Sequence, residues 1–304
     1  MPQSTFKSFH SLSVEHPDFA THPRFWTSHH LSAVKCSFQQ VESEVHEPVI
    51  LDTKQAEEMG KWALDLADEK CVEMKSSTID ALLCSNEPTP ITYTDYWLTF
   101  HYGQRIVRLY NSHVHIYCIK EEISMPPANP IIGYYTYTAD KERRKKLIAN
   151  RAPNGRINKP AQNICDIKYR KVTPTDWRHD PYLVCLLMSL AQLQKRHALT
   201  APKGPFLARL LVTNLADVTN AYVYKADIPR QLLESLDCPT RTIEDFIFPT
   251  VNYVVVPFEP YSTFAERVRA ELVGPEYYSP PDPADSNQAV PSDPQGEKRK
   301  RDEE

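Results

Sequence analysis

An acidic and a basic side chain stand two residues apart at Asp166 and Lys168, in the run Asp166-Ile-Lys168. The residues from Ile164 to Val172 predict a β-strand, and side chains two apart on a strand point to the same face. A carboxylate in that position can hold a divalent cation such as Mg²⁺, and a neighbouring lysine can stabilise negative charge that develops on a phosphoryl group. These residue types at this spacing indicate metal-dependent cleavage of a phosphodiester.

Metal-dependent nucleases of the PD-(D/E)xK class have such a layout: a strand with acid-x-lysine, an acid on a neighbouring strand, then a buried helix and two further strands. Asp140, after a predicted strand over 132–138, or Glu121 would be the second acid, so Asp140 and Asp166 are the candidate metal ligands. The same short pattern occurs at three other places, and with 39 acids in the chain such matches arise by chance. An active nuclease, a degenerate nuclease-like protein and an ordinary surface ion pair all stay open.

Two histidines also share one face of a predicted strand, at His113 and His115, with Glu121 further along. Cupin metal sites use a similar His-x-His and a later glutamate. Here the glutamate lies slightly too far along the chain, and no second motif with glycine and histidine follows it. We interpret the pair as exposed strand histidines.

The scarcity of glycine excludes several classes of enzyme. The chain has seven glycines, and the closest two are 22 residues apart, as at Gly133 and Gly155. A P-loop, a dinucleotide-binding fingerprint, a Gly-x-Ser-x-Gly nucleophile elbow and the Gly-rich loop of protein kinases each need closely spaced glycines. We therefore expect no cofactor, with Mg²⁺ as the exception if the nuclease hypothesis holds.

Basic residues gather between Asp140 and Lys159, where eight Lys and Arg face two acids, a net charge of +6. The whole chain, in contrast, carries a formal net charge of −4. A solvated loop is the plain interpretation, and a contact surface for a protein partner or for nucleic-acid phosphates is the functional one. The candidate contact residues are Arg143, Arg144, Lys145 and Lys146.

Hydrophobic patterning predicts the elements that position these groups. We expect an amphipathic helix from Thr53 to Lys70, and a helix from Pro181 to about His197 that is apolar on nearly all sides and therefore central and buried. Runs rich in β-formers predict strands over residues 91–100, 104–110, 113–119, 132–138, 164–172, 206–213, 221–227 and 251–257. The predicted fold class is α+β, with a mixed or mainly antiparallel sheet, packed helices including the central one, and a disordered C-terminal tail.

Composition divides the chain into three parts. Residues 1–48 predict a loosely ordered arm, residues 49–275 a globular α+β domain, and residues 276–304, rich in Pro, Asp and Ser, a disordered tail. The globular part is either one unit or two subdomains joined by a basic loop over 140–163. The tail ends in a short basic run that an import receptor could recognise, made of Lys298, Arg299, Lys300 and Arg301.

The compartment follows from what the chain lacks. It has no apolar run long enough to span a bilayer and no N-terminal apolar stretch typical of a secretion signal, and its seven cysteines are widely spread. We expect a protein that is neither secreted nor inserted in a membrane, and that is nuclear or cytoplasmic.

The segment from about residue 165 to 272 contains the runs Asp180-Pro-Tyr-Leu-Val-Cys-Leu-Leu-Met, Tyr222-Val-Tyr-Lys-Ala226 and Val256-Pro-Phe-Glu-Pro-Tyr261. It resembles a recurring pattern in uncharacterised proteins of filamentous fungi. The resemblance implies a fungal, intracellular setting and no catalytic residues. The absence of a catalytic motif, together with the concentration of basic residues over 141–159, favours a non-enzymatic binding or accessory protein of unknown pathway. A metal-dependent phosphodiesterase that uses Asp166 and Lys168 is the alternative.

Overall fold

The structure, a computed structural model, describes residues 8–16, 21–43, 53–84, 91–109, 114–119, 131–197, 204–242 and 248–274. The predicted tail over 276–304, with its basic run Lys298–Arg301, falls outside these ranges. So do His113 and Glu121, the outer members of the predicted histidine site.

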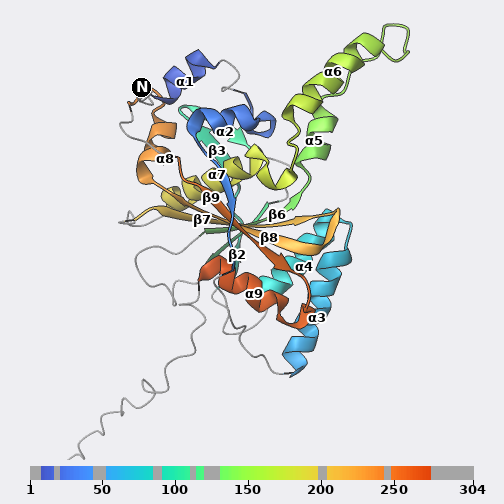
Figure 1. Cartoon of the computed structure of the whole chain (residues 1–304), viewed down its shortest axis with the longest axis vertical. Helices are drawn as coiled ribbons and strands as arrows, with labels where there is room; N and C mark the ends of the chain where they lie inside the picture. The colour runs from blue at the N-terminus through green and yellow to red at the C-terminus, as the bar shows by residue number, and fades with distance from the viewer. Residues whose placement is uncertain are drawn as a thin grey trace, which may run out of the picture.

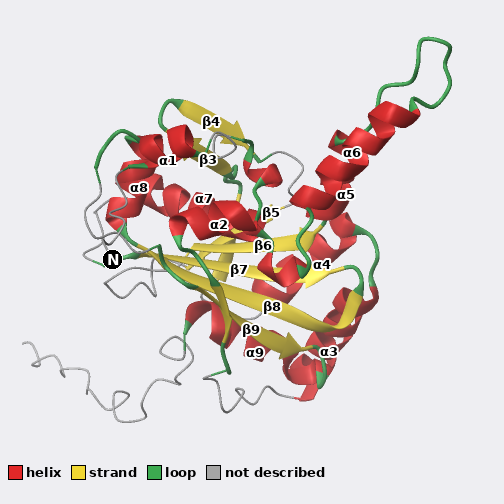
Figure 2. Cartoon of the chain, turned by 45° about the horizontal axis from the view of Figure 1, so that its top comes forward, coloured by secondary structure: helices red, strands yellow, loops and turns green. Residues whose placement is uncertain are grey.

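A mixed sheet crosses the middle of the molecule, and helices pack on both of its faces (Figures 1 and 2). Within the described residues it has seven strands in the order β1-β9-β8-β7-β6-β5-β2. The pairs β1–β9 and β6–β7 are parallel, and the other neighbours are antiparallel. The strands are Phe38–Gln40 (β1), Ile91–Thr94 (β2), Val114–Ile119 (β5), Ile131–Tyr137 (β6), Phe206–Asn214 (β7), Asp217–Ile228 (β8) and Val251–Pro257 (β9). The predicted α+β class with a mixed sheet is confirmed.

Helix α7 (Pro181–His197) covers one face of the sheet, over β6, β7 and β8. Every residue from Pro181 to Leu193 is buried, as expected for a helix that is apolar on nearly all sides. The helix begins where the Asp180 carboxylate accepts a hydrogen bond from the backbone N–H of Tyr182 at 2.9 Å. The prediction of a buried central helix is confirmed.

The opposite face of the sheet is covered by α3 (Thr53–Asp68), α4 (Val72–Cys84) and α9 (Tyr261–Val273). Helix α3 turns Met59, Ala63 and Leu66 inward, in agreement with the predicted amphipathic helix. It lies close to α9 at Gly60, where an added Cβ would stand 3.4 Å from the Cα of Ser262.

A short hairpin and a small helix pack beside the C-terminal end of α7. The hairpin joins β3 (Thr99–Tyr102) to β4 (Arg105–Arg108), and α8 (Arg230–Asp237) lies next to it. The side chain of Gln192 ties α7 to the hairpin, because its Oε1 accepts from the His101 N–H at 2.9 Å and its Nε2 donates to the His101 carbonyl at 2.8 Å.

The N-terminal segment is more ordered than the sequence predicts. Its described residues form α1 (Phe9–Glu15), the 3₁₀-helix η2 (Pro23–Phe25), α2 (Ser28–Val34) and the edge strand β1. Phe9, Trp26 and Leu31 are buried in the core around α7, and β1 pairs with β9. The expectation of a loosely ordered arm over 1–48 is therefore not met by residues 8–16 and 21–43, because these few apolar anchors find places in the core.

Two predicted strands differ from the structure. The run 91–100 is divided into β2 and β3, which belong to different sheets. The run 164–172 is not a strand at all, since it forms the C-terminal part of α6 (Lys159–Val172). This helix, with the preceding α5 (Ala139–Lys146), projects away from the body of the molecule (Figures 1 and 2).

Candidate functional site

The strongest surface feature is the projecting segment of residues 144–172, which we call the basic arm. It comprises the end of α5, the connection over 147–158 and all of α6. None of the fourteen residues of α6, every one of which the structure describes, is buried. The arm therefore offers nearly its whole surface to a partner.

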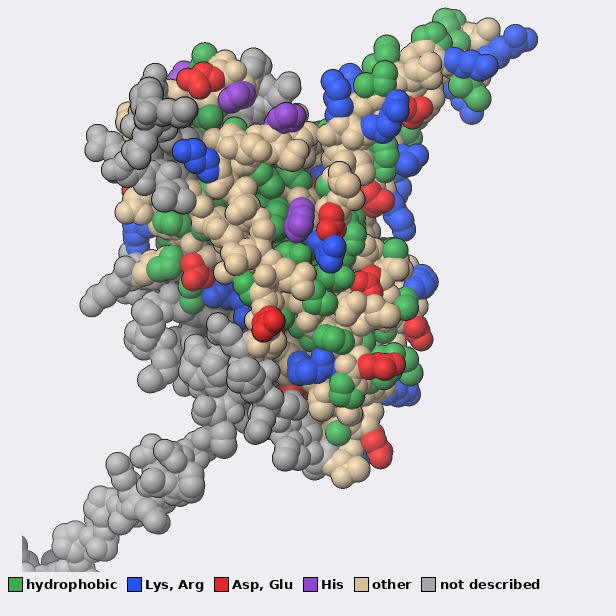
Figure 3. Space-filling view, viewed as in Figure 1, with side chains coloured by type: hydrophobic (Ala, Val, Ile, Leu, Met, Phe, Trp, Pro, Cys, Tyr) green, Lys and Arg blue, Asp and Glu red, His purple; other side chains and the backbone are tan. Residues whose placement is uncertain are grey.

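The charge of the basic arm is opposite to that of the rest of the chain. The arm has nine Lys and Arg against one Asp, a net charge of +8, whereas the whole chain carries −4. The remainder of the chain therefore carries −12. Lys and Arg side chains lie along the whole length of the arm (Figure 3). A surface of this kind attracts polyanions, with a strength that depends on salt concentration.

Local interactions explain why the arm is helical. The side chain of Asn158 caps α6 by accepting a hydrogen bond from the Ala161 N–H at 3.2 Å, and Pro160 stands in the first turn. The guanidinium of Arg144 lies over the ring of Tyr169 at 4.3 Å, which joins α5 to α6. Asn-Lys-Pro at 158–160 is a helix-start signal that could have marked α6 in the sequence.

A buried ion pair holds the base of the arm. The guanidinium of Arg143 donates to both carboxylate oxygens of Asp180 at 2.6 Å, and its Nε donates to the Arg24 carbonyl at 2.6 Å. The Tyr137 hydroxyl also donates to Asp180, at 2.7 Å. Burial opposes the charge on Arg143, but the hydrogen bonds and charge of Asp180 outweigh it and raise the pKa of the guanidinium.

Arg143 was expected among the partner contacts, and the structure places it elsewhere. Its side chain is completely inaccessible to solvent, so it cannot touch a partner and instead fixes α5 to the start of α7. Arg144, Lys145 and Lys146 are exposed, as a contact surface requires.

Asp166 and Lys168 do not form the expected site. On a helix, residues two apart are separated by about 200° around the axis, so the two side chains cannot share a face. Both are exposed, and Asp166 accepts a hydrogen bond from Gln162 at 3.0 Å within the same helix. Asp140 is half-buried in the first turn of α5. In the described ranges, no group of three or more His, Cys, Asp or Glu side chains is placed to hold a metal ion.

Strand β6 carries hydroxyl groups on the face toward α4. β6 is the last sheet strand before the buried helix α7, and β7 and β8 follow that helix. Tyr134 and Thr136 lie two residues apart on the face of β6 toward α4, the face that also carries Ile132. The Tyr134 hydroxyl lies 2.9 Å from the hydroxyls of Thr136 and of Thr213 on β7. Neither an acid nor a lysine occupies this pair of positions.

The neighbouring strand β5 carries a small polar cluster on the same face. The Tyr117 hydroxyl donates to Oδ1 of Asp80 on α4 at 2.5 Å, and Nδ1 of His115 lies 3.2 Å from the same oxygen. Burial and the Asp80 charge hold the pKa of Tyr117 well above its ordinary value, and burial raises the pKa of Tyr134 to about 12. Both phenols are therefore protonated at neutral pH, and Tyr117 donates its proton to Asp80 in a hydrogen bond.

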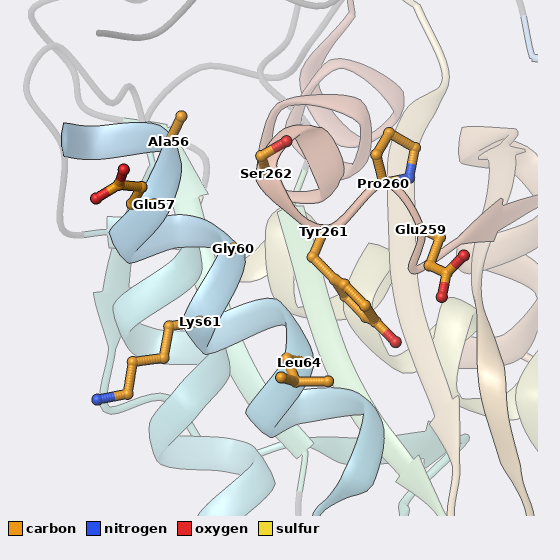
Figure 4. A pocket seen from close by; sticks show the side chains of 9 residues that line it. All are labelled: Ala56, Glu57, Gly60, Lys61, Leu64, Glu259, Pro260, Tyr261 and Ser262. Atoms are coloured by element: carbon orange, nitrogen blue, oxygen red, sulfur yellow. The ribbon is translucent and has the colours of Figure 1, made fainter. Parts of the chain in front are cut away.

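A groove lies between α3 and the connection from β9 to α9 (Figure 4). Its volume is about 760 Å³, and its lining is mainly apolar. Leu64 and the ring of Tyr261 approach one another from the two walls, while Glu57, Lys61 and Glu259 lie along its rim (Figure 4). The other lining residues are Ala56, Gly60, Pro260 and Ser262. These groups do not form a catalytic constellation.

No protein-family model matches the chain, and a search of curated proteins finds no match. Among the described residues, none of the helices has the length and apolar character needed to cross a membrane.

Proposed function

We propose that the protein is a non-enzymatic accessory protein that binds nucleic acid through its basic arm. The observation that carries the proposal is the concentration of a net charge of +8 in a projecting segment of a chain that is otherwise strongly acidic. Phosphates would be attracted to the arm and repelled by the body, so contact would be confined to residues 144–172.

The order of elements around α7 supports binding without cleavage. In the proposed relation to a degenerate PD-(D/E)xK nuclease, β6, α7, β7 and β8 would be the matching elements, and Tyr134 and Thr136 would take the place of the acid and the lysine. A degenerate nuclease-like protein of this kind would keep a nucleic-acid surface and lack the groups that hold a metal ion.

The test is fluorescence anisotropy with a labelled DNA duplex of about 20 base pairs over a series of salt concentrations. Lys168→Glu with Lys171→Glu reverses two exposed charges on the arm, and Lys54→Glu with Lys61→Glu makes the same change on α3. We expect the arm variant to bind at least about tenfold more weakly and to reduce the slope of log K against log salt by about 1.8, the loss of two phosphate contacts. The α3 variant should bind as the wild type does. Equal binding by the two variants, or no duplex binding by the wild type at low salt, would refute the proposal.

A cleavage assay with Mg²⁺ or Mn²⁺ separates binding from catalysis. The proposed protein leaves the duplex intact, because no described cluster of side chains can hold the metal. Cleavage that is lost in Asp166→Ala would instead support the phosphodiesterase.

A protein partner is the second candidate, and exposed isoleucines on the arm favour it. Ile157 is 76% exposed and Ile164 is 55% exposed, and aliphatic groups of this kind contribute little to phosphate binding. Ile157→Ser with Ile164→Ser should leave duplex affinity unchanged under the leading proposal. If this variant abolishes a complex that the charge reversals leave intact, the arm binds protein.

The terminal run Lys298–Arg301 supports a nuclear rather than a cytoplasmic location for a protein of this function. Replacing the four residues by alanine in a fluorescent fusion should move the protein from nucleus to cytoplasm. An unchanged distribution would show that the basic run does not direct nuclear import.

A further inference from the structure

Helix α6 presents apolar and basic side chains to solvent along one face. Four exposed residues lie on this face because they are spaced three or four residues apart, and we call them the α6 stripe: Ile164, Ile167, Lys168 and Lys171. Ile164 is 55% exposed and Ile167 is 48% exposed. Asp166, the single acid of α6, lies about 200° around the helix axis from both Ile164 and Lys168. Apolar anchors at this spacing are typical of an amphipathic helix that lies in a groove of a partner.

The groove between α3 and the β9–α9 connection matches the α6 stripe in character and length. Leu64 and Tyr261 give it apolar walls, and the carboxylates of Glu57 and Glu259 lie along its rim (Figure 4). Leu64 is 42% exposed, so the apolar wall is open to solvent. The wall formed by α3 extends from Ala56 to Leu64, about 12 Å along the helix axis, and the α6 stripe extends for about 10 Å. Two turns of α6 therefore fit the length of the groove.

The charges of the two surfaces are opposite in sign. The α6 stripe has two lysines and no acid. The charged residues that line the groove are Glu57, Lys61 and Glu259, a net charge of −1. The contrast is larger over the whole chain, where the basic arm carries +8 and the remainder carries −12. Complementary charge of this kind favours a basic helix over an acidic one as the occupant of the groove.

The arm and the groove of one molecule lie far apart. Arg143 ties the base of the arm to Asp180 at the start of α7, on one face of the sheet, whereas α3 and α9 cover the opposite face. Figures 1 and 2 show α6 projecting away from α3 and α9. The groove that α6 can reach therefore belongs to a second molecule. Such a contact is head-to-tail, because each copy offers its arm to one neighbour and its groove to another.

We propose that α6 of one molecule lies in the groove between α3 and α9 of a second copy of this chain. The isoleucines of the α6 stripe pack against the apolar walls, and its lysines lie beside the acidic rim. Two helical turns bury much less area than the roughly 1,600 Å² of a standard interface, so the dissociation constant is expected to be on the order of 100 μM. The inference goes beyond the proposed function and does not depend on it, since no nucleic acid takes part in the contact.

Sedimentation equilibrium of the full chain, purified free of nucleic acid, measures the association at concentrations from about 10 to 500 μM. The average mass of the wild type should rise above the monomer mass as the concentration increases. Ile164→Ser with Ile167→Ser removes the apolar anchors and keeps every charge, and Leu64→Ser removes part of the groove wall. Each should weaken association at least about tenfold. The matched control is Ile106→Ser on β4, at a position that is 61% exposed, which should associate as the wild type does.

Mixing variants tests the head-to-tail geometry. The isoleucine variant keeps its groove and the Leu64→Ser variant keeps its α6, so together they should form a 1:1 complex although neither associates alone. A charge exchange makes the same test without loss of apolar surface. Lys168→Glu with Lys171→Glu, and Glu57→Lys with Glu259→Lys, should each weaken association alone and restore it when the two proteins are mixed.

Three results would overturn the proposal. The first is a wild type that stays monomeric up to about 500 μM. The second is association that survives the isoleucine or the Leu64→Ser change, and the third is a pair of variants that fails to associate when mixed. Thermal melting checks that each variant is folded, as expected for changes at these incompletely buried positions. None of these results decides duplex binding, which the anisotropy assay measures separately.

Discussion

Replacing Arg143 by methionine should destabilise the protein more than any other single change at a basic residue of the run 143–146. Arg143 is inaccessible to solvent and is bound through both terminal nitrogens to Asp180. The replacement fills part of the volume but leaves the carboxylate of Asp180 buried with two remaining donors, the Tyr137 hydroxyl and the Tyr182 N–H. The protein then holds a buried negative charge without a cation.

The size of the effect follows from that uncompensated charge. Removing one partner of a buried ion pair costs about 3–5 kcal/mol, because the other charge keeps its desolvation penalty. This range includes the cost of losing the hydrogen bond from Nε of Arg143 to the Arg24 carbonyl. For a chain of this size each kcal/mol corresponds to a shift of about 2–4 °C in Tm, so a decrease of roughly 6–20 °C is expected.

Urea unfolding followed by circular dichroism measures the change. The matched control is Arg241→Met, which breaks an exposed pair with Glu234, where Arg241 is 63% exposed. Such a surface pair contributes at most about 1 kcal/mol. The double variant Arg143→Met with Asp180→Asn removes both charges and keeps a side-chain oxygen to cap α7. It should regain at least about 1 kcal/mol relative to Arg143→Met alone.

The reasoning fails if Arg143→Met costs no more than Arg241→Met. It also fails if the double variant is as unstable as the sum of its two single changes, because the charges would then not be coupled. In either case the buried pair would not be what holds α5 to the start of α7, and another contact would have to hold the basic arm in place.

Two further predictions concern the interior. Lys75 is buried, and burial lowers its pKa to about 8, so it binds fewer protons in the folded than in the unfolded chain between pH 8 and about 10.5. The free energy of unfolding should therefore rise by up to about 3 kcal/mol over that interval, and Lys75→Met should raise it at pH 7 and remove the pH dependence. A wild-type stability that falls from pH 8 to 10 in a way that Lys75→Met abolishes would contradict this sign. Gly133→Ala should cost about 1–3 kcal/mol in urea unfolding, since its Cβ would stand 2.9 Å from Cδ1 of Leu190 and 3.0 Å from Cδ1 of Leu210. An unchanged midpoint would show that these leucines can move aside.

The parts of the fold that could be predicted are those with a strong local signal. The central helix has a helix-start pair at Asp180-Pro181 and a long apolar stretch, and the strands on either side of it are rich in β-branched and aromatic residues. The helix is buried on all sides and the strands are largely buried on both faces, so their high apolar content alone predicts that they lie in the core. The mixed sheet of the α+β fold follows from them.

Helix α6 has a helical signal that the strand prediction overlooked. Although none of its residues is buried, its half-buried residues Ala161, Cys165, Tyr169 and Val172 recur at intervals of three or four, the spacing of one face of a helix. Ile167 and Tyr169 also alternate with Asp166, Lys168 and Arg170, and this short alternation predicts a strand instead. This error also made the predicted acid-x-lysine site wrong, because Asp166 and Lys168 would share a face only on a strand.

The N-terminal segment was missed because its order comes from distant contacts. Its two α-helices have seven residues each, too few for a clear period, and they are far shorter than an isolated helix needs. Strand β1 has three residues and exists only because β9, more than two hundred residues later, offers an open edge. Tertiary pairing of this kind leaves little trace in local sequence.

The run Arg143–Lys146 shows why composition alone cannot assign a function to each charge. Successive residues of a helix are about 100° apart, so at the end of α5 only one of the four side chains can face the core. That residue is Arg143, and its partner Asp180 lies 37 residues further along the chain. The other three are exposed, where they are available to phosphates. The same basic run thus contains one buried anchor and three exposed side chains, and a variant that reverses all four charges would confuse any loss of binding with lost stability. Substitutions on α6 avoid this, because none of its residues is buried.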